Sequence, residues 1–118
     1  MESKHTLFKS FSFAFEGFKV ALIKGRNFKI QFILGVFACI LGLILRLTPH
    51  EWAVLVITIT LVLILELINT SLESIVNIVS TEIRNEAKIA KDVAAASVLI
   101  ASIASVFIGL LLFLPKIF

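Results

Sequence analysis

Five polar side chains interrupt a long apolar stretch of the chain, namely Glu66, Asn69, Thr70, Glu73 and Asn77. Counted from the first, they are offset by three, four, seven and eleven residues, so a helix would carry them on one face about 100° wide. The other faces of that helix would carry Leu, Ile and Val. Carboxylates inside a membrane are costly and usually functional, so this face is the first candidate for chemistry.

The two glutamates of this face are seven residues apart, which is about 10 Å along a helix axis. If this helix runs from the outer face of the membrane to the cytoplasmic face, Glu73 lies near the cytoplasmic surface, where it can meet a water-soluble group. Glu66 lies deeper, where it can meet a group carried by a lipid. In an alternative interpretation the helix ends near Leu65 and the polar face is solvated. That alternative fits Asn77 and Ser80 better than Glu66, because Glu66 has apolar neighbours on both sides.

A charged segment after this helix adds candidates for binding phosphate. Residues 81–92 are expected to form a cytoplasmic connection, with Lys91 and Asp92 at the point where the next helix begins. A lysine at such a point can hold a phosphate, and the helix N-terminus adds amide donors. Equally, Asp92 would cap the helix and Lys91 would anchor it at the membrane interface.

Carboxylates on one helix beside such a lysine are typical of a site for a magnesium nucleotide. Carboxylates and substrate phosphates bind Mg²⁺ together, and phosphoryl transfer depends mostly on positioning and charge neutralisation. The chain has no G-x-x-x-x-G-K-[ST] loop and neither the H-R-D nor the D-F-G motif of protein kinases. A kinase with this sequence would therefore belong to none of those classes.

The composition indicates a membrane protein. Of 118 residues, 59% are apolar and 16% are charged, and the mean hydropathy is +1.08. An average soluble domain is about half apolar and about a quarter charged, which argues against a soluble globular enzyme and a disordered chain. Cys39 is the single cysteine, so a disulfide scaffold is excluded as well. A bilayer crossing takes about 20 apolar residues, and the apolar stretches suffice for three crossings.

The predicted fold is all-α and integral to the membrane, with residues 1–118 as a single domain. An amphipathic interfacial helix is expected over residues 1–28, and transmembrane helices over residues 29–47, 52–80 and 93–114. Pro49 indicates a turn over residues 48–51, and the third span is expected to stop at Pro115. In the third span Ser97, Ala101, Ser105 and Gly109 recur every four residues, which favours close helix packing.

The N-terminal helix is predicted from apolar residues at helical spacing. They are Leu7, Phe8, Phe11, Phe15, Phe18 and Leu22. Such a helix would lie in the cytoplasmic interface of the membrane. Packing of the same apolar face against the other three helices is the alternative.

Basic residues predict the orientation in the membrane. They gather before the first span, at Lys4, Lys9, Lys19, Lys24, Arg26 and Lys29, and between the second and third spans, at Arg84, Lys88 and Lys91. Because basic loops face the cytoplasm, the N-terminus is expected inside and the C-terminus outside. The net charge of +3 suits anionic lipid headgroups, and no pattern typical of nucleic-acid binding is present.

Two segments resemble the signature of the prokaryotic diacylglycerol kinase family: ELINTSLE over residues 66–73 and AKIAKDVAAA over residues 87–96. The spacing between them also agrees, and the resemblance covers nearly the whole chain. The Arg26-Asn27-Phe28 segment and the Phe-Leu-Pro-Lys ending are more similar to the Gram-positive branch, whose members are similar to undecaprenol kinases.

The resemblance implies a homotrimer in the bacterial cell membrane, with sites shared between neighbouring chains, that transfers phosphate from ATP with Mg²⁺ to a lipid alcohol. Undecaprenol is the preferred alcohol and diacylglycerol the alternative. The implied roles are proton removal from the lipid hydroxyl by Glu66 with Asn69 beside it, Mg²⁺ binding by Glu73, phosphate binding by Lys91, and contacts to other parts of ATP by Glu82, Arg84 and Asp92.

The chain departs from the family pattern at two places. Relatives commonly carry an acidic residue, a second metal ligand, just before the Arg-Asn pair, where this chain has Gly25. Metal binding would then rest on Glu73 with phosphate oxygens and water. The loop also reads Arg84-Asn85 where many relatives have a histidine.

Two other classes of protein compete with a kinase. A proton-coupled transporter subunit would need its acid near the membrane midplane, whereas both acids are expected in the cytoplasmic half of their span. A structural or holin-like membrane protein needs no carboxylate face. Substitution of Glu66 or Glu73 by Gln would leave the structural protein working and would silence the kinase.

Overall fold

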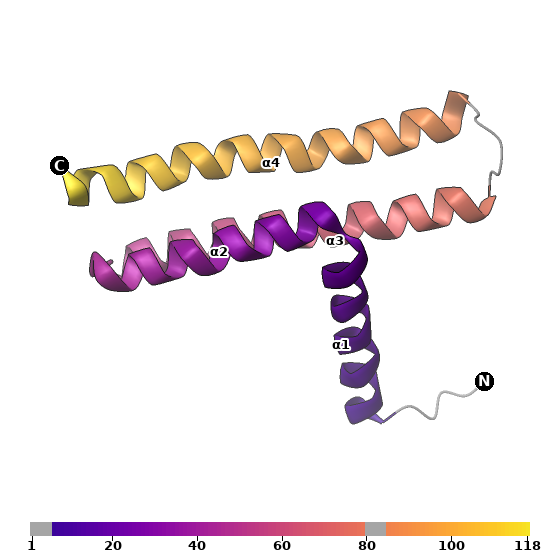
Figure 1. Ribbon diagram of the computed structural model, residues 1–118, viewed down its shortest axis with the longest axis horizontal. Helices are drawn as coiled ribbons and strands as arrows, with labels where there is room; N and C mark the ends of the chain where they lie inside the picture. The colour runs from indigo at the N-terminus through magenta and orange to yellow at the C-terminus, as the bar shows by residue number, and fades with distance from the viewer. Residues whose placement is uncertain (1–5, 80–84) are drawn as a thin grey trace.

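The computed structural model describes residues 6–79 and 85–118. Over these two ranges the chain forms four helices: α1 (Leu7–Lys24), α2 (Arg26–Ile44), α3 (Pro49–Val79) and α4 (Asn85–Ile117). Helix α3 packs against both α2 and α4, and these three run lengthwise together, whereas α1 is directed away from them (Figure 1). The predicted all-helical fold is confirmed.

Helices α2, α3 and α4 are each long and apolar enough to cross a membrane. At 1.5 Å per residue, the 19 residues of α2 extend over about 28 Å, close to the thickness of a hydrocarbon core. The 31 residues of α3 and the 33 of α4 extend over about 46 and 50 Å. Both therefore continue beyond a bilayer core, which agrees with three predicted crossings.

The junction of α1 and α2 differs from the predicted boundary at residue 28. The helix ends at Lys24, and Gly25 adopts an extended conformation from which its N–H donates to the Ala21 carbonyl at 2.8 Å. The spacing of apolar residues continues through the break, which is why the sequence did not indicate it. Phe28, only 1% exposed, lies at the start of α2 and meets the edge of Phe18, 5.5 Å away between ring centroids.

This aromatic contact fixes only the last turns of α1. Farther toward the N-terminus the apolar residues are uncovered, with Phe8 81% and Phe11 67% exposed. The alternative in which the whole apolar face of this helix packs on the other three is therefore wrong within the chain. Ala21 is buried and Phe18 is partly buried, so the end of α1 next to α2 packs on the other helices.

The connection between α2 and α3 is a tight turn over residues 45–48. Arg46 has a left-handed φ of 58°, and the Leu47 N–H donates to the Gly42 carbonyl at 3.1 Å, which satisfies one of the last carbonyls of α2. The predicted turn at residues 48–51 is wrong, because α3 begins at Pro49. Proline is favoured in the first helical turn, where its missing N–H has no partner to lose.

The start of α3 is capped by two reciprocal hydrogen bonds. The Thr48 N–H donates to Glu51 Oε1 at 2.8 Å, and the Glu51 N–H donates to Thr48 Oγ1 at 3.3 Å, which forms a capping box. The Lys116 ammonium near the end of α4 lies 3.0 Å from the same Glu51 carboxylate. The start of α3 and the end of α4 are thereby joined.

Helix α4 begins at Asn85, eight residues before the predicted start at 93. The expectation that Lys91 and Asp92 open this helix is wrong, and so is the expected cap by Asp92. Residues 85–92 contain no helix breaker, and the Lys88 ammonium lies 2.7 Å from the Asp92 carboxylate one turn away. The helix also continues past Pro115 to Ile117, since proline this close to the end removes little.

Close helix contacts hold α2 against α3. A Cβ on Gly35 would lie 2.9 Å from Ile59 Cγ2, and a Cβ on Gly42 would lie 3.0 Å from the Trp52 ring, so a larger residue at either position would force these α3 side chains to shift. A buried cluster of Leu47, Leu55 and Phe113 joins the α2–α3 turn, α3 and α4 at this end, and Ala38 and Leu41 of α2 pack against it. Of the small-residue series on α4, Ala101 is buried, whereas a Cβ on Gly109 would meet no atom within 4 Å.

Candidate functional site

The predicted polar face lies on one unbroken helix. Glu66 is only 3% exposed, Asn69 and Thr70 are partly buried, and Glu73 and Asn77 are exposed. Because α3 continues to Val79, the alternative in which the helix ends near Leu65 is wrong. Along α3 the face therefore changes from a buried acid to an exposed one.

A cavity of about 340 Å³ surrounds the buried end of this face, and we call it the Glu66 cavity. Its walls come from α2, α3 and α4 and include Asn27, Gln31, Glu66, Asn69, Val98 and Ser102. Three polar residues from α2 and α4 thus surround a carboxylate that the sequence places in an apolar stretch. Sequence reasoning had not assigned Asn27, Gln31 or Ser102 to the site.

A second cavity of about 500 Å³ adjoins the first, and we call it the Glu73 cavity. It is lined by the junction of α1 and α2 and by α3, and includes Lys24, Arg26, Asn27, Glu66, Asn69 and Glu73. Asn27, Glu66 and Asn69 line both cavities, so the two lie next to each other. Two cations and two carboxylates therefore face one polar space.

Asn69 lies between the two glutamates and carries an unused acceptor. Its Oδ1 atom is buried and has no hydrogen-bond partner in the part of the chain that the structure describes. The Thr70 hydroxyl donates to the Glu66 backbone carbonyl at 2.9 Å. Since a buried acceptor without a partner is costly, Asn69 is the residue of this face whose geometry points to a bound ligand.

The carboxylates of the site fit a Mg²⁺ ion that arrives with a phosphate ligand. Among residues 6–79 and 85–118 there is no cluster of three or more His, Cys, Asp or Glu that could hold a metal alone. Mg²⁺ commonly uses one or two carboxylates together with substrate phosphates and water. Glu73, exposed at the mouth of its cavity, is a suitable carboxylate for that mode.

The predicted nucleotide contacts on α4 are not brought into these cavities. Asp92 is exposed and paired with Lys88, and neither Lys91 nor Asp92 lines the Glu66 or Glu73 cavity. Ala95, one turn after Lys91, does line the Glu66 cavity, so Lys91 lies on the same side of α4. Glu82 and Arg84 lie outside the described residues.

Gln31 is the site residue that the sequence could have indicated. It is an uncharged polar residue inside an otherwise apolar span, as Glu66 is a charged one. Its Nε2 atom donates to Ser102 Oγ at 3.0 Å, which connects α2 with α4 beside Glu66. Nothing in the sequence singled out Asn27 or Ser102 as a site residue. Asn27 lies at a helix start, where polar residues are common, and Ser102 lies among other small residues of α4.

Comparison with known proteins agrees with the geometry of a membrane-embedded site. A family model described as prokaryotic diacylglycerol kinase matches residues 12–113. The chain is 44% identical over 112 residues to a Synechocystis protein named diacylglycerol kinase, covering 94% of the chain and 64% of that relative. It is 36% identical over 110 residues to a Bacillus subtilis protein named undecaprenol kinase, covering 93% and 89%.

A third relative, from Helicobacter pylori, is named diacylglycerol kinase and is 37% identical over 97 residues, or 82% of the chain and 76% of the relative. Two substrate names therefore occur among relatives of similar identity.

Proposed function

The chain belongs to the prokaryotic diacylglycerol kinase family, and we propose that it is a membrane lipid kinase that transfers phosphate from ATP, with Mg²⁺, to a lipid alcohol. The observation that carries this proposal is the buried Glu66 near Asn69 Oδ1, which has no partner among the described residues, in a cavity that adjoins the one lined by Glu73. This arrangement offers a buried base, a free acceptor and an exposed metal ligand on one helix face.

In the proposed reaction Glu66 accepts the proton of the lipid hydroxyl, and the hydroxyl oxygen attacks the γ-phosphorus of ATP while ADP leaves. Asn69 would hold the hydroxyl oxygen by donating from its amide NH2 group, since the single hydroxyl proton goes to Glu66. Its Oδ1 atom remains an acceptor for a bound water. Glu73 would hold Mg²⁺, which neutralises phosphate charge when bound. The two cations at the α1–α2 junction, Lys24 and Arg26, add positive charge to the same cavity.

The depths of the two acids support these roles. If Trp52 lies at one membrane interface, Glu66 is about 21 Å from it along α3 and Glu73 about 32 Å. A hydrocarbon core is about 30 Å thick, so Glu66 would lie inside the far boundary and Glu73 at the headgroups. The basic residues of α1 and of the α3–α4 segment favour a cytoplasmic location for that boundary, with the N-terminus inside and the C-terminus outside.

We propose undecaprenol as the alcohol, with diacylglycerol as the alternative. The relative named undecaprenol kinase is matched over 89% of its length, whereas the chain spans 64% of the Synechocystis relative named diacylglycerol kinase. The resemblance of the Arg26-Asn27-Phe28 segment to the Gram-positive branch favours the same choice.

We also propose a homotrimer with sites shared between chains and with α1 in the membrane interface. Support comes from the uncovered apolar residues of α1 and from the position of Lys91 and Asp92, which lie on α4 outside both cavities of their own chain. A neighbouring chain could contribute these residues. Contacts of Glu82, Arg84, Lys91 and Asp92 with ATP are part of the proposal.

The test is transfer of label from γ-³²P ATP to lipid by the purified protein in mixed micelles with Mg²⁺. Undecaprenol and diacylglycerol are offered separately, with Glu66→Gln as the inactive variant and Glu16→Gln, an exposed acid on α1, as its matched control. Label in one lipid that is lost only in Glu66→Gln supports the kinase and identifies the alcohol. No label in either lipid, from protein with an intact helical spectrum, would overturn the proposal.

A further inference from the structure

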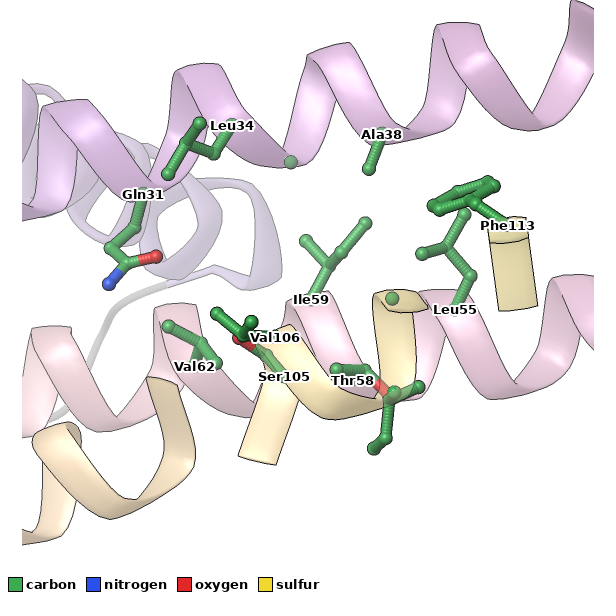
Figure 2. A pocket seen from close by; sticks show the side chains of 13 residues that line it. Gln31, Leu34, Ala38, Leu55, Thr58, Ile59, Val62, Ser105, Val106 and Phe113 are labelled. Carbon is green, nitrogen blue, oxygen red and sulfur yellow. The ribbon is translucent and has the colours of Figure 1, made fainter. Parts of the chain in front are cut away.

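A third cavity continues from the Glu66 cavity along the same side of α3, and we call it the apolar groove. It has a volume of about 190 Å³ and is walled by residues of α2, α3 and α4, including Leu34, Ala38, Ile59, Val62, Val106 and Phe113. Figure 2 shows these side chains converging from the helices, with Gln31 at one end and Phe113 at the other. The groove therefore leads away from the Glu66 cavity.

The hydroxyl groups along this groove are already engaged. Thr58 Oγ1 donates to the Val54 carbonyl at 2.7 Å, and Ser105 Oγ donates to the Ser102 carbonyl at 2.7 Å. Each hydrogen bond is made within its own helix. The groove consequently presents hydrocarbon to whatever occupies it, and an apolar occupant leaves none of these donors unsatisfied.

The size of the groove suits a hydrocarbon chain as the occupant. A helix with its side chains is about 10–12 Å across, so a neighbouring helix could place only single side chains into about 190 Å³. A dry cavity of about 150 Å³ is enough for a molecule the size of benzene. From Val62 to Leu55 the groove follows α3 for about 10 Å. These dimensions suit a segment of one hydrocarbon chain.

The connection between the two cavities supplies the remaining step. Gln31 lines both the Glu66 cavity and the apolar groove, and its hydrogen bond to Ser102 lies at their boundary. Resting on the proposed function, we propose that the groove holds the hydrocarbon chain of the lipid alcohol whose hydroxyl lies at Glu66. Gln31 and Ser102 then mark the point where the chain leaves the polar cavity.

Gly109 offers a way to block the groove without disturbing the fold. It lines the groove, and a Cβ at this position would meet no atom within 4 Å. Gly109→Leu should raise the KM for the lipid by at least about tenfold, because excluding two methylenes costs about that factor in affinity. The KM for MgATP should not change. Ala104→Leu, on an exposed part of the same helix, is the matched control and should leave both values unchanged.

Occupancy is measured directly by thiol labelling. Gly109→Cys is placed in a Cys39→Ala background and labelled with a maleimide in micelles containing undecaprenol, diacylglycerol or neither, with Ala104→Cys as the control. Slower labelling with either lipid, at position 109 alone, supports the groove and identifies which alcohol fills it. Equal labelling with and without lipid would overturn the proposal that the groove binds the lipid chain. Labelling that is already blocked before lipid is added would overturn it too, because a second copy of the chain would then cover the groove.

The same samples separate this inference from the proposed function. Protection of the Gly109→Cys thiol from the maleimide without transfer of ³²P to lipid would support lipid binding in the groove and contradict the proposed kinase activity. Transfer of ³²P without protection of this thiol would support the kinase activity and contradict lipid binding in the groove.

Discussion

Gln31 on α2 and Ser102 on α4, 71 residues apart in the chain, are joined by a hydrogen bond of 3.0 Å from Gln31 Nε2 to Ser102 Oγ. The bond lies at the boundary between the cavity that contains Glu66 and the apolar groove. It therefore fixes the spacing of α2 and α4 at the point where a lipid hydroxyl would meet its hydrocarbon chain.

Removal of this bond should destabilise the protein. Ser102→Ala leaves the partly buried Gln31 amide without its partner, at a cost of about 1–3 kcal/mol. Ser97→Ala is the matched control, because the Ser97 hydroxyl bonds only to its own helix and is exposed. Thermal unfolding in micelles measures both. The double variant Gln31→Leu with Ser102→Ala should recover stability, since neither polar group then remains. Equal unfolding temperatures for Ser102→Ala and Ser97→Ala would contradict the prediction.

Loss of the two glutamates should have different kinetic consequences. Glu66→Gln should lower kcat by about 10²–10⁴, as expected for a general base, with the KM for MgATP unchanged. Glu73→Gln should instead raise the Mg²⁺ concentration needed for half-maximal rate, because Glu73 is the exposed metal ligand. Magnesium titrations at saturating lipid distinguish the two. Identical effects of both substitutions would contradict the division of roles.

Restoring an acid at position 25 should not improve the enzyme. A Cβ on Gly25 would lie 2.6 Å from the Ala21 backbone carbonyl, so even Gly25→Ala should lower the unfolding temperature, by an amount equivalent to about 1–3 kcal/mol. Gly17→Ala is the control, since its Cβ would meet nothing within 4 Å and alanine favours a helix. A Gly25→Glu variant that is as stable as the parent and more active would show that the junction adapts.

Lys88 and Lys91 should differ in their effect on nucleotide binding. Lys88 forms an exposed pair with Asp92, and water and salt screen such pairs strongly, so Lys88→Gln should alter stability little and leave the KM for ATP unchanged. Lys91→Gln should raise that KM, because Lys91 is the proposed phosphate contact. Initial rates over a range of ATP concentrations measure the KM for ATP of each variant. An equal rise of this KM in both variants would contradict the prediction, because it would assign the effect to the loss of one positive charge.

Removal of metal should stop the reaction without unfolding the protein. Mg²⁺ is proposed to bind at the exposed Glu73 together with the phosphates of ATP, so the helices should not depend on it for their fold. Excess EDTA should abolish transfer of label and leave the far-UV circular dichroism unchanged, with activity restored by Mg²⁺. A loss of helical signal on chelation would contradict this prediction.

Features that depend on neighbours within a few helical turns could be predicted from the residues alone. The apolar spans and the common face of Glu66, Asn69 and Glu73 follow from periodicity along single helices, and three helices long and apolar enough to cross a membrane agree with the predicted number of spans. The family resemblance rests instead on the residue types of segments 66–73 and 87–96. Local pattern also explains the errors. Residues 85–92 favour a helix as readily as a loop, and Gly25 interrupts an apolar series that continues on both sides.

Contacts between residues of different helices could not be predicted in this way. The bond between Gln31 and Ser102, the enclosure of Asn69 Oδ1 and the apolar groove arise from packing between segments far apart in the chain. Helix periodicity gives the face on which a side chain lies but not the partner that face will contact. That partner is chosen by close packing, such as the contact that Gly35 permits with Ile59, and so requires the assembled helices.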